Sequence, residues 1–152
     1  MTVEIGSPAP SFELFDQNRN LVSLESLRGN KGLIVFMPFP FTGICDGESC
    51  LIRDRLASLN DVGAGVVVIT THAVPTNNHW AEENGFEFPV LSDYWPHGEV
   101  ARAYGTFSER GGVAYRSTFV VDGDGLLREK IASDSLGTPR EFEAYTSALT
   151  AF

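Results

Sequence analysis

Two apolar runs constrain the fold of this chain more than any other feature of its sequence. GLIVFMPF (residues 32–39) and GVVVITT (residues 65–71) contain few polar side chains. Strands with such runs are typically buried on both faces, as parallel strands are in the centre of a sheet. Between them, residues 47–60 carry apolar side chains at helical spacing. The pattern therefore predicts a strand–helix–strand unit.

The remaining segments extend this unit into a mixed sheet with helices. A short hairpin is expected near the start, where the polar turn QNRN separates FELFD from LVSL. Further strands and helices alternate along the chain: a helix at 75–85, a strand at 88–93, a helix at 98–105, and strands at 114–122 and 126–133 joined by the DGDG turn. The final helix is expected from Thr138, as N-cap, with Pro139 at its first position. This order predicts an α/β chain with a thioredoxin-like fold, in which helices flank a central mixed sheet and residues 1–152 form a single domain.

Composition excludes several classes of partner. The chain has 20 acidic and 11 basic residues and a net charge of −9, which argues against binding to nucleic acid or to an anionic membrane. No apolar run approaches the roughly 18 residues that a transmembrane helix needs. The N-terminal MTVEIGSPAP lacks the basic and apolar regions of a secretory signal, so we expect a cytoplasmic protein.

Both cysteines lie in the bend PFPFTGICDGESC, which spans residues 38–50. If a helix begins near Thr42 or Gly43, Cys45 lies in its first turn, where free N–H groups and the positive helix end favour a thiolate. The Thr42 hydroxyl is expected to reach back to the sulfur and to help cap the helix. Pro38 ends the strand without an N–H and shields the sulfur. Taken alone, Pro38 and Thr42 each fit a purely structural role better, and only their spacing from Cys45 favours a functional one.

The spacing of Pro38, Thr42 and Cys45 matches the P-x-x-x-[ST]-x-x-C signature of peroxiredoxins, thiol peroxidases with a thioredoxin-like fold. The resemblance runs from GSPAPSFEL to the final helix. The segments NNHWA, FPVLSDYWPHG and YRSTFVVD resemble the alkyl hydroperoxide reductase E-type subgroup of actinobacteria. This resemblance implies that Cys45 attacks the O–O bond of a peroxide and becomes a sulfenic acid. It implies no metal, haem or flavin cofactor, because the sulfur carries the two-electron chemistry.

An arginine and an acidic residue also match positions of the family. Arg116 in YRSTFVVD matches the family arginine, which stabilises the thiolate and polarises the peroxide. Strand alternation puts Arg116 on one face with Ala114 and Thr118, where a guanidinium needs an anionic or polar partner. A structural ion pair is the alternative. Glu48 matches an acidic position that orients this arginine, although the helix dipole explains it equally well.

Cys50 resembles the resolving cysteine of the bacterioferritin comigratory protein branch, five residues after the peroxide-reacting cysteine. On an ideal helix the two Cα atoms lie roughly 8.6 Å apart, beyond the ~7 Å limit for a disulfide. A Cys45–Cys50 bond therefore requires the helix to unwind, and Gly47 lowers the cost by about 1 kcal/mol relative to alanine. The alternatives are that Cys50 packs as a small hydrophobic residue, and that an external thiol resolves Cys45.

Other classes of function remain open at this point. Cys45, Cys50 and one of His72, His79 or His97 are candidates for a three-ligand metal site, although C-x4-C is not a usual ligand spacing. The DGDG segment lacks the later ligands of an EF-hand, so it is a turn rather than a calcium site. A non-enzymatic partner protein of the same fold is a further alternative. A thioredoxin-type reductase is disfavoured because the chain has no C-x-x-C.

The resemblance also suggests partners. The expected substrates are hydrogen peroxide and organic hydroperoxides. The expected reductant is thioredoxin, a glutaredoxin-like mycoredoxin or a low-molecular-weight thiol such as mycothiol. The aromatic residues Phe39, Phe41, Trp80 and Trp95 are expected in the core or at the rim of the site, where the tryptophans could report oxidation. An aromatic rim also suits apolar hydroperoxides and a homodimer contact.

Overall fold

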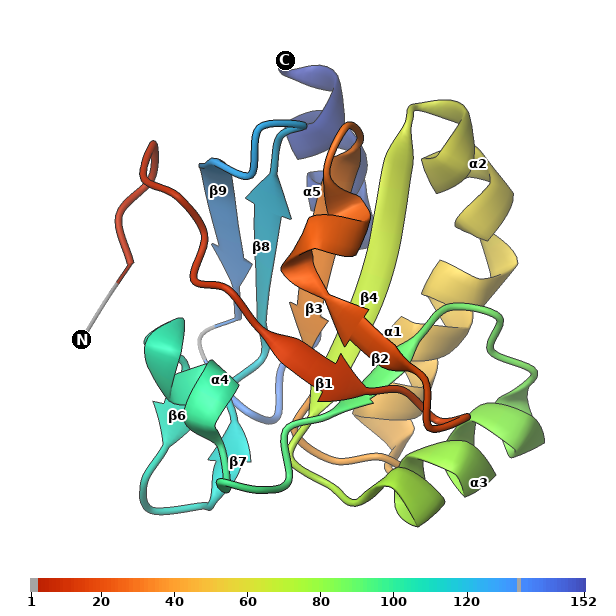
Figure 1. The fold of residues 1–152 in the computed structure, drawn as a ribbon. Coiled ribbons are helices and arrows are strands. Elements are labelled where there is room, and N and C mark those ends of the chain that lie inside the picture. Colours follow the sequence, from red (N-terminus) through yellow and green to blue (C-terminus); the bar gives the residue numbers. More distant parts are fainter. Residues whose placement is uncertain (1–2, 134) are drawn as a thin grey trace.

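A five-stranded mixed sheet forms the centre of the molecule in the computed structural model, which describes residues 3–133 and 135–152 (Figure 1). Its strands lie in the order β5-β4-β3-β8-β9. They span Val90–Ser92, Ala64–Thr70, Lys31–Phe36, Ser117–Val121 and Leu127–Ala132, respectively. Strands β3, β4 and β5 are parallel, whereas β8 pairs antiparallel with both β3 and β9. The predicted central mixed sheet and thioredoxin-like fold are confirmed.

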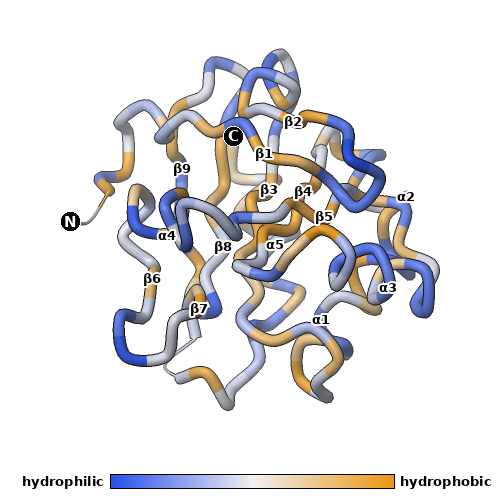
Figure 2. The backbone as a smooth tube through the Cα atoms, turned by 60° about the horizontal axis from the view of Figure 1, so that its bottom comes forward, coloured by the Kyte–Doolittle hydropathy of each residue, from blue (hydrophilic) through white to orange (hydrophobic). Residues whose placement is uncertain are grey.

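The apolar runs occupy the places that their sequence predicts. In β3 every residue after Lys31 is buried, because β4 and β8 flank it and both of its faces are covered. Figure 2 shows that hydrophobic residues predominate along β3, β4 and β5, and that hydrophilic residues make up much of α3 at the periphery.

Two layers cover the sheet. Residues from α1 (Gly43–Asp54), α2 (Leu56–Asp61), α3 (Val74–Asn84) and α5 (Phe142–Thr150) pack with Leu33 and Val35 in one core cluster. The second cluster, on the side of Ile34 and Phe36, is covered by the 3-10 helix η1 (Leu24–Leu27), α4 (Glu99–Ala103) and the N-terminal hairpin of β1 (Glu13–Phe15) and β2 (Leu21–Ser23). Strands β6 (Phe107–Ser108) and β7 (Val113–Ala114) form a small separate hairpin. Among the described residues, no helix is long and apolar enough to cross a membrane.

Several local predictions are confirmed by the backbone. Helix α3 ends at Gly85, which adopts the left-handed conformation (φ 67°) that glycine accommodates best. The DGDG segment is the turn of the β8–β9 hairpin, and the Asp122 carboxylate accepts hydrogen bonds from the N–H groups of Asp124 and Leu126. The turn therefore uses its aspartate to hold its own backbone.

Two helix boundaries differ from the predictions. The helix predicted through residues 47–60 is divided at Arg55, whose backbone (φ −111°, ψ 16°) leaves the helical region. The last helix begins at Phe142 with Glu141 as N-cap, so the prediction that Thr138 caps it is wrong. Glu141 has an extended backbone (φ −83°, ψ 125°), and the preceding Arg140 N–H donates to the Glu48 carboxylate outside the helix.

Candidate active site

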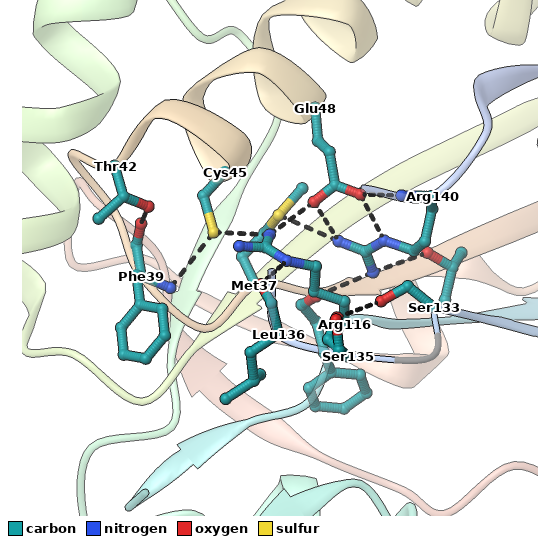
Figure 3. A network of polar contacts seen from close by, with 12 residues as sticks. Met37, Phe39, Thr42, Cys45, Glu48, Arg116, Ser133, Ser135, Leu136 and Arg140 are labelled. Carbon is teal, nitrogen blue, oxygen red and sulfur yellow. Dashed lines mark hydrogen bonds and ion pairs between the residues drawn. The ribbon is translucent and has the colours of Figure 1, made fainter. Parts of the chain in front are cut away.

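The bend that carries both cysteines connects the carboxyl end of β3 to the amino end of α1. In an open α/β sheet, reactive groups gather beyond the carboxyl ends of the strands. Strand β3 ends at Phe36 and α1 begins at Gly43, as the sequence predicts, which places Cys45 in the first turn of the helix. Figure 3 shows the side chains that meet there.

The Cys45 sulfur is fully buried and accepts two hydrogen bonds. The Phe39 N–H donates to Sγ at 3.3 Å, and Nη1 of Arg116 donates at 2.9 Å (Figure 3). A backbone amide and a guanidinium both stabilise negative charge on an acceptor. Both hydrogen bonds therefore reach the one atom of Cys45 that can act as a nucleophile.

Arg116 reaches the sulfur because of the antiparallel register of β3 and β8. Phe36 pairs with Ser117, so the residue before β8 lies beside the loop that follows β3. Arg116 is only 3% exposed, and its Nε donates to the carbonyl of Leu136 at 2.7 Å. The predicted alternation holds in part: Ala114 belongs to β7 and packs in the other core cluster, because β8 begins only at Ser117.

Glu48 lies one helical turn after Cys45 and is held between two arginines. Its Oε1 accepts from Arg116 Nη1 at 2.8 Å and from Arg140 Nη2 at 3.0 Å, while Oε2 accepts from Arg140 Nε and the Arg140 N–H, both at 2.8 Å. Burial acts to raise the pKa of Glu48, but the hydrogen bonds and charge of Arg140, with the charge of Arg116, outweigh it and lower the pKa below its ordinary 4.5. Glu48 is therefore a buried carboxylate that fixes Arg116 beside the sulfur.

Thr42 and Pro38 border the same loop. The Thr42 hydroxyl donates to the carbonyl of Phe39 at 2.6 Å and makes no side-chain cap, so the expected contacts with the sulfur and with the helix end are absent. The hydroxyl instead braces the loop residue whose own N–H points to Cys45. Pro38 is buried, and its carbonyl lies 3.2 Å from Nε2 of His72.

Cys50 lies further along the same helix and is half-buried. Its thiol donates to Oδ1 of Asn84 at 3.7 Å, and the side chain packs against the core cluster that contains Cys45. Both cysteines are free, and α1 is continuous across them. In this structure the two cysteines are not bonded to each other, and the arrangement with α1 continuous from Gly43 to Asp54 is called the closed state below.

Arg140 is a site residue that sequence reasoning missed. It is 7% exposed and also donates to the carbonyl of Phe36 and to the Thr118 hydroxyl, which in turn contacts the Tyr145 hydroxyl. In the sequence Arg140 stands in the apparent first turn of the last helix. A cation there opposes the helix dipole, and this was the one signal that could have indicated another role.

The predicted metal alternative gains no support from the arrangement of the side chains. Across residues 3–133 and 135–152, no group of three or more His, Cys, Asp or Glu side chains is placed to hold a metal ion. The three histidines have other contacts: His72 is near Pro38, His79 pairs with Glu83 at 3.6 Å, and His97 lies 2.7 Å from the carbonyl of Gly112.

Comparison with known proteins agrees with this geometry. The AhpC/TSA family profile matches residues 5–130. Alkyl hydroperoxide reductase E of Mycobacterium tuberculosis is 44% identical over 150 residues, covering 98% of this chain and 97% of that protein. The crystal structure of Enterococcus faecalis AhpC superposes with a TM-score of 0.89 at 26% identity, covering 99% and 92% of the two chains. Peroxidoxin BcpB of M. tuberculosis gives a TM-score of 0.82 at 29% identity, covering 97% and 95%. The resemblance seen in the sequence is thus confirmed, and the chain belongs to the AhpC/TSA family as a peroxiredoxin, a thiol peroxidase enzyme.

Proposed function

We propose that Cys45 is the peroxide-reacting nucleophile of this peroxiredoxin. The observation that carries the proposal is the buried Cys45 sulfur that accepts hydrogen bonds from Phe39 N–H and Arg116 Nη1. The same two donors suit the transition state, because negative charge moves from the sulfur to the departing oxygen as the O–O bond breaks. Donors fixed in advance in a buried site stabilise such charge without reorganising.

The first step is an oxygen transfer from the peroxide to the sulfur. The Cys45 thiolate attacks one peroxide oxygen, an S–O bond forms, and the O–O bond breaks. The second oxygen leaves and takes up a proton, as water from hydrogen peroxide or as an alcohol from an organic hydroperoxide. Cys45 is oxidised to a sulfenic acid and the peroxide is reduced. In this scheme Arg116 contacts the reacting atoms, whereas Thr42 and Pro38 shape the loop that aims the Phe39 N–H.

In the second step, Cys50 resolves the sulfenic acid. The Cys50 thiolate attacks the Cys45 sulfur, the S–O bond breaks, the S–S bond forms, and the departing oxygen leaves as water. Since about 8.6 Å separates Cα atoms five residues apart on an ideal helix, α1 must unwind between the cysteines first. The alternative is a one-cysteine enzyme in which an external thiol attacks Cys45 and Cys50 only packs.

The proposal also assigns substrates, partners and location. The relative from M. tuberculosis is named an alkyl hydroperoxide reductase, and the exposed rings of Phe39 and Phe41 beside the bend suit an organic hydroperoxide as well as hydrogen peroxide. A thiol reductant, namely thioredoxin, a glutaredoxin-like mycoredoxin or a low-molecular-weight thiol, restores the reduced enzyme. The enzyme acts in the cytoplasm, where free thiols persist, as a homodimer.

Intact mass measurement after one equivalent of hydrogen peroxide tests both steps. We expect loss of two hydrogens within seconds, and gain of one oxygen in a Cys50→Ser variant, because the sulfenic acid then has no internal partner. Cys45→Ser should neither gain oxygen nor consume peroxide. Gain of oxygen in the wild type, with Cys50 still alkylatable, would replace the two-cysteine cycle with the one-cysteine alternative. Unchanged peroxide consumption by Cys45→Ser would overturn the assignment of Cys45.

A further inference from the structure

The hydroxyl of Ser49 is buried in α1 without a hydrogen-bond partner. Ser49 is 0% exposed. Throughout residues 3–133 and 135–152, its Oγ is the one buried side-chain nitrogen or oxygen atom that makes no hydrogen bond. Buried polar groups in native proteins nearly always have partners, so an exception of this kind calls for an explanation.

Three polar side chains near Ser49 on the same helix do have hydrogen-bond partners. Asp46 Oδ1 accepts from Nε1 of Trp80 at 2.7 Å, Glu48 is held by its two arginines, and the Cys50 thiol donates to Asn84. These contacts fix the closed helix to the rest of the molecule. Ser49 is the opposite case, because it loses its hydration on burial and gains no hydrogen bond in return.

The position of Ser49 gives this cost a local consequence. It lies between Gly47 and Cys50, inside the segment that must unwind before Cys45 and Cys50 can meet. When that segment opens, the Ser49 hydroxyl reaches water and the cost of its burial disappears. A penalty paid only in the closed state raises the population of the open state.

We infer that Ser49 destabilises the closed form of α1 and so sets how often the helix opens between the two cysteines. Ser49 is a positioning residue in this account, since it acts on the helix and not on the peroxide. That this opening accelerates Cys45–Cys50 disulfide formation rests on the proposed function. The effect on helix opening does not.

Hydrogen exchange of the reduced full-length protein tests the inference directly. In Ser49→Ala, we expect the backbone amides of residues 46–50 to exchange about tenfold more slowly than in the wild type, a difference of about 1.4 kcal/mol. Alanine also has the higher helix propensity, which accounts for no more than about threefold. Ser58→Ala, at an exposed position in α2, serves as the matched control. Its effect on the exchange of the α2 amides measures the contribution of helix propensity alone.

Disulfide formation after rapid mixing with peroxide supplies a second readout. We expect Ser49→Ala to form the sulfenic acid at the wild-type rate and then to convert it to the disulfide, with loss of water, about tenfold more slowly. The inference is overturned if Ser49→Ala slows the exchange of the α1 amides by no more than Ser58→Ala slows that of the α2 amides. This outcome does not depend on the role of Cys50. Slower exchange in a protein that forms no internal disulfide upholds the role of Ser49 and removes Cys50 as the resolving thiol. If exchange is slower but the disulfide forms at the wild-type rate, helix opening at Ser49 does not limit resolution, and that part of the inference is overturned.

Discussion

At the scale of single residues, the Glu48 carboxylate is shared by two guanidinium groups that come from distant parts of the chain. Arg116 precedes β8 and Arg140 precedes α5, and all three side chains are buried. A buried ion pair need not stabilise a protein relative to apolar residues, but removal of one partner leaves an uncompensated charge. The site therefore depends on all three residues together.

Loss of Arg140 should be costly for stability. We expect Arg140→Met to lower the free energy of unfolding by about 3–5 kcal/mol, because the buried Glu48 loses the charge of Arg140 and both hydrogen bonds from its guanidinium. Urea denaturation at neutral pH measures the change. Arg110→Met, at an exposed position, is the control and should shift the free energy by less than about 0.5 kcal/mol. A similar small shift for Arg140→Met would show that the triad tolerates an unpaired carboxylate.

Asp93 should give the fold a pH dependence of its own. Burial raises the pKa of Asp93 to about 6, although the N–H groups of Val100 and Ala101 donate to its carboxylate. Because the folded pKa lies above the ordinary 3.8, the protonated form favours folding, and this contribution is lost as the pH rises from about 4 to about 6. The shift corresponds to about 3 kcal/mol.

The Asp93→Asn variant isolates that contribution. We expect its free energy of unfolding, measured in urea from pH 4 to pH 7, to lack the decline attributed to Asp93. The asparagine should also cost about 1 kcal/mol at low pH, since one amide oxygen replaces two acceptor oxygens. Parallel pH profiles for the variant and the wild type would contradict the assignment.

At the scale of elements, one carboxylate oxygen of α1 contacts both α3 and the loop that precedes α1. Oδ1 of Asp46 accepts from the buried indole N–H of Trp80 and from the N–H of Phe41 at 3.1 Å. We expect Asp46→Ala to destabilise the fold by about 1–3 kcal/mol, because a buried donor loses its partner. Urea denaturation provides the measurement, and Glu82→Ala, at an exposed position of α3, is the control. If the two variants have equal stability, the Asp46–Trp80 contact contributes nothing.

The elements also differ in how far the sequence alone predicts them. The central strands and α3 follow from local patterns, because apolar runs, helical spacing and Gly85 act within a few residues. The start of α5 does not, since Thr138 and Pro139 favour an earlier start, whereas in the structure Glu141 is extended and the Arg140 N–H donates to the distant carboxylate of Glu48. The orientation of the Thr42 hydroxyl was missed for a related reason. The motif specifies the residue, but the bend geometry places the Phe39 carbonyl 2.6 Å from the Thr42 hydroxyl, which donates to it.

At the scale of the whole molecule, the two tryptophans report on opposite environments. Trp80 is 0% exposed in the core, whereas Trp95 is 81% exposed. We expect the fluorescence of Trp80→Phe to be red-shifted and readily quenched by iodide, and that of Trp95→Phe to be blue-shifted and nearly insensitive. Because a homodimer contact over Trp95 would shield it, quenching of Trp80→Phe is measured over a dilution series. Equal quenching of the two variants at high dilution would contradict the placement of the rings.

The charges of the side chains around the Cys45 sulfur can be added together. Arg116 and Arg140 bring two positive charges and Glu48 one negative charge, so the thiolate that the proposed function assigns to Cys45 would bring the sum of these four charges to zero. A serine hydroxyl does not ionise near neutral pH, and Cys45→Ser therefore leaves a buried cation without its counterion. We expect sodium sulfate or chloride to raise the melting temperature of Cys45→Ser more than that of the wild type, as anions replace the missing charge. An equal rise in the melting temperatures of the two proteins would contradict this charge balance. A larger salt response of Cys45→Ser would mean that the serine variant is a charge variant of this protein and not a silent replacement.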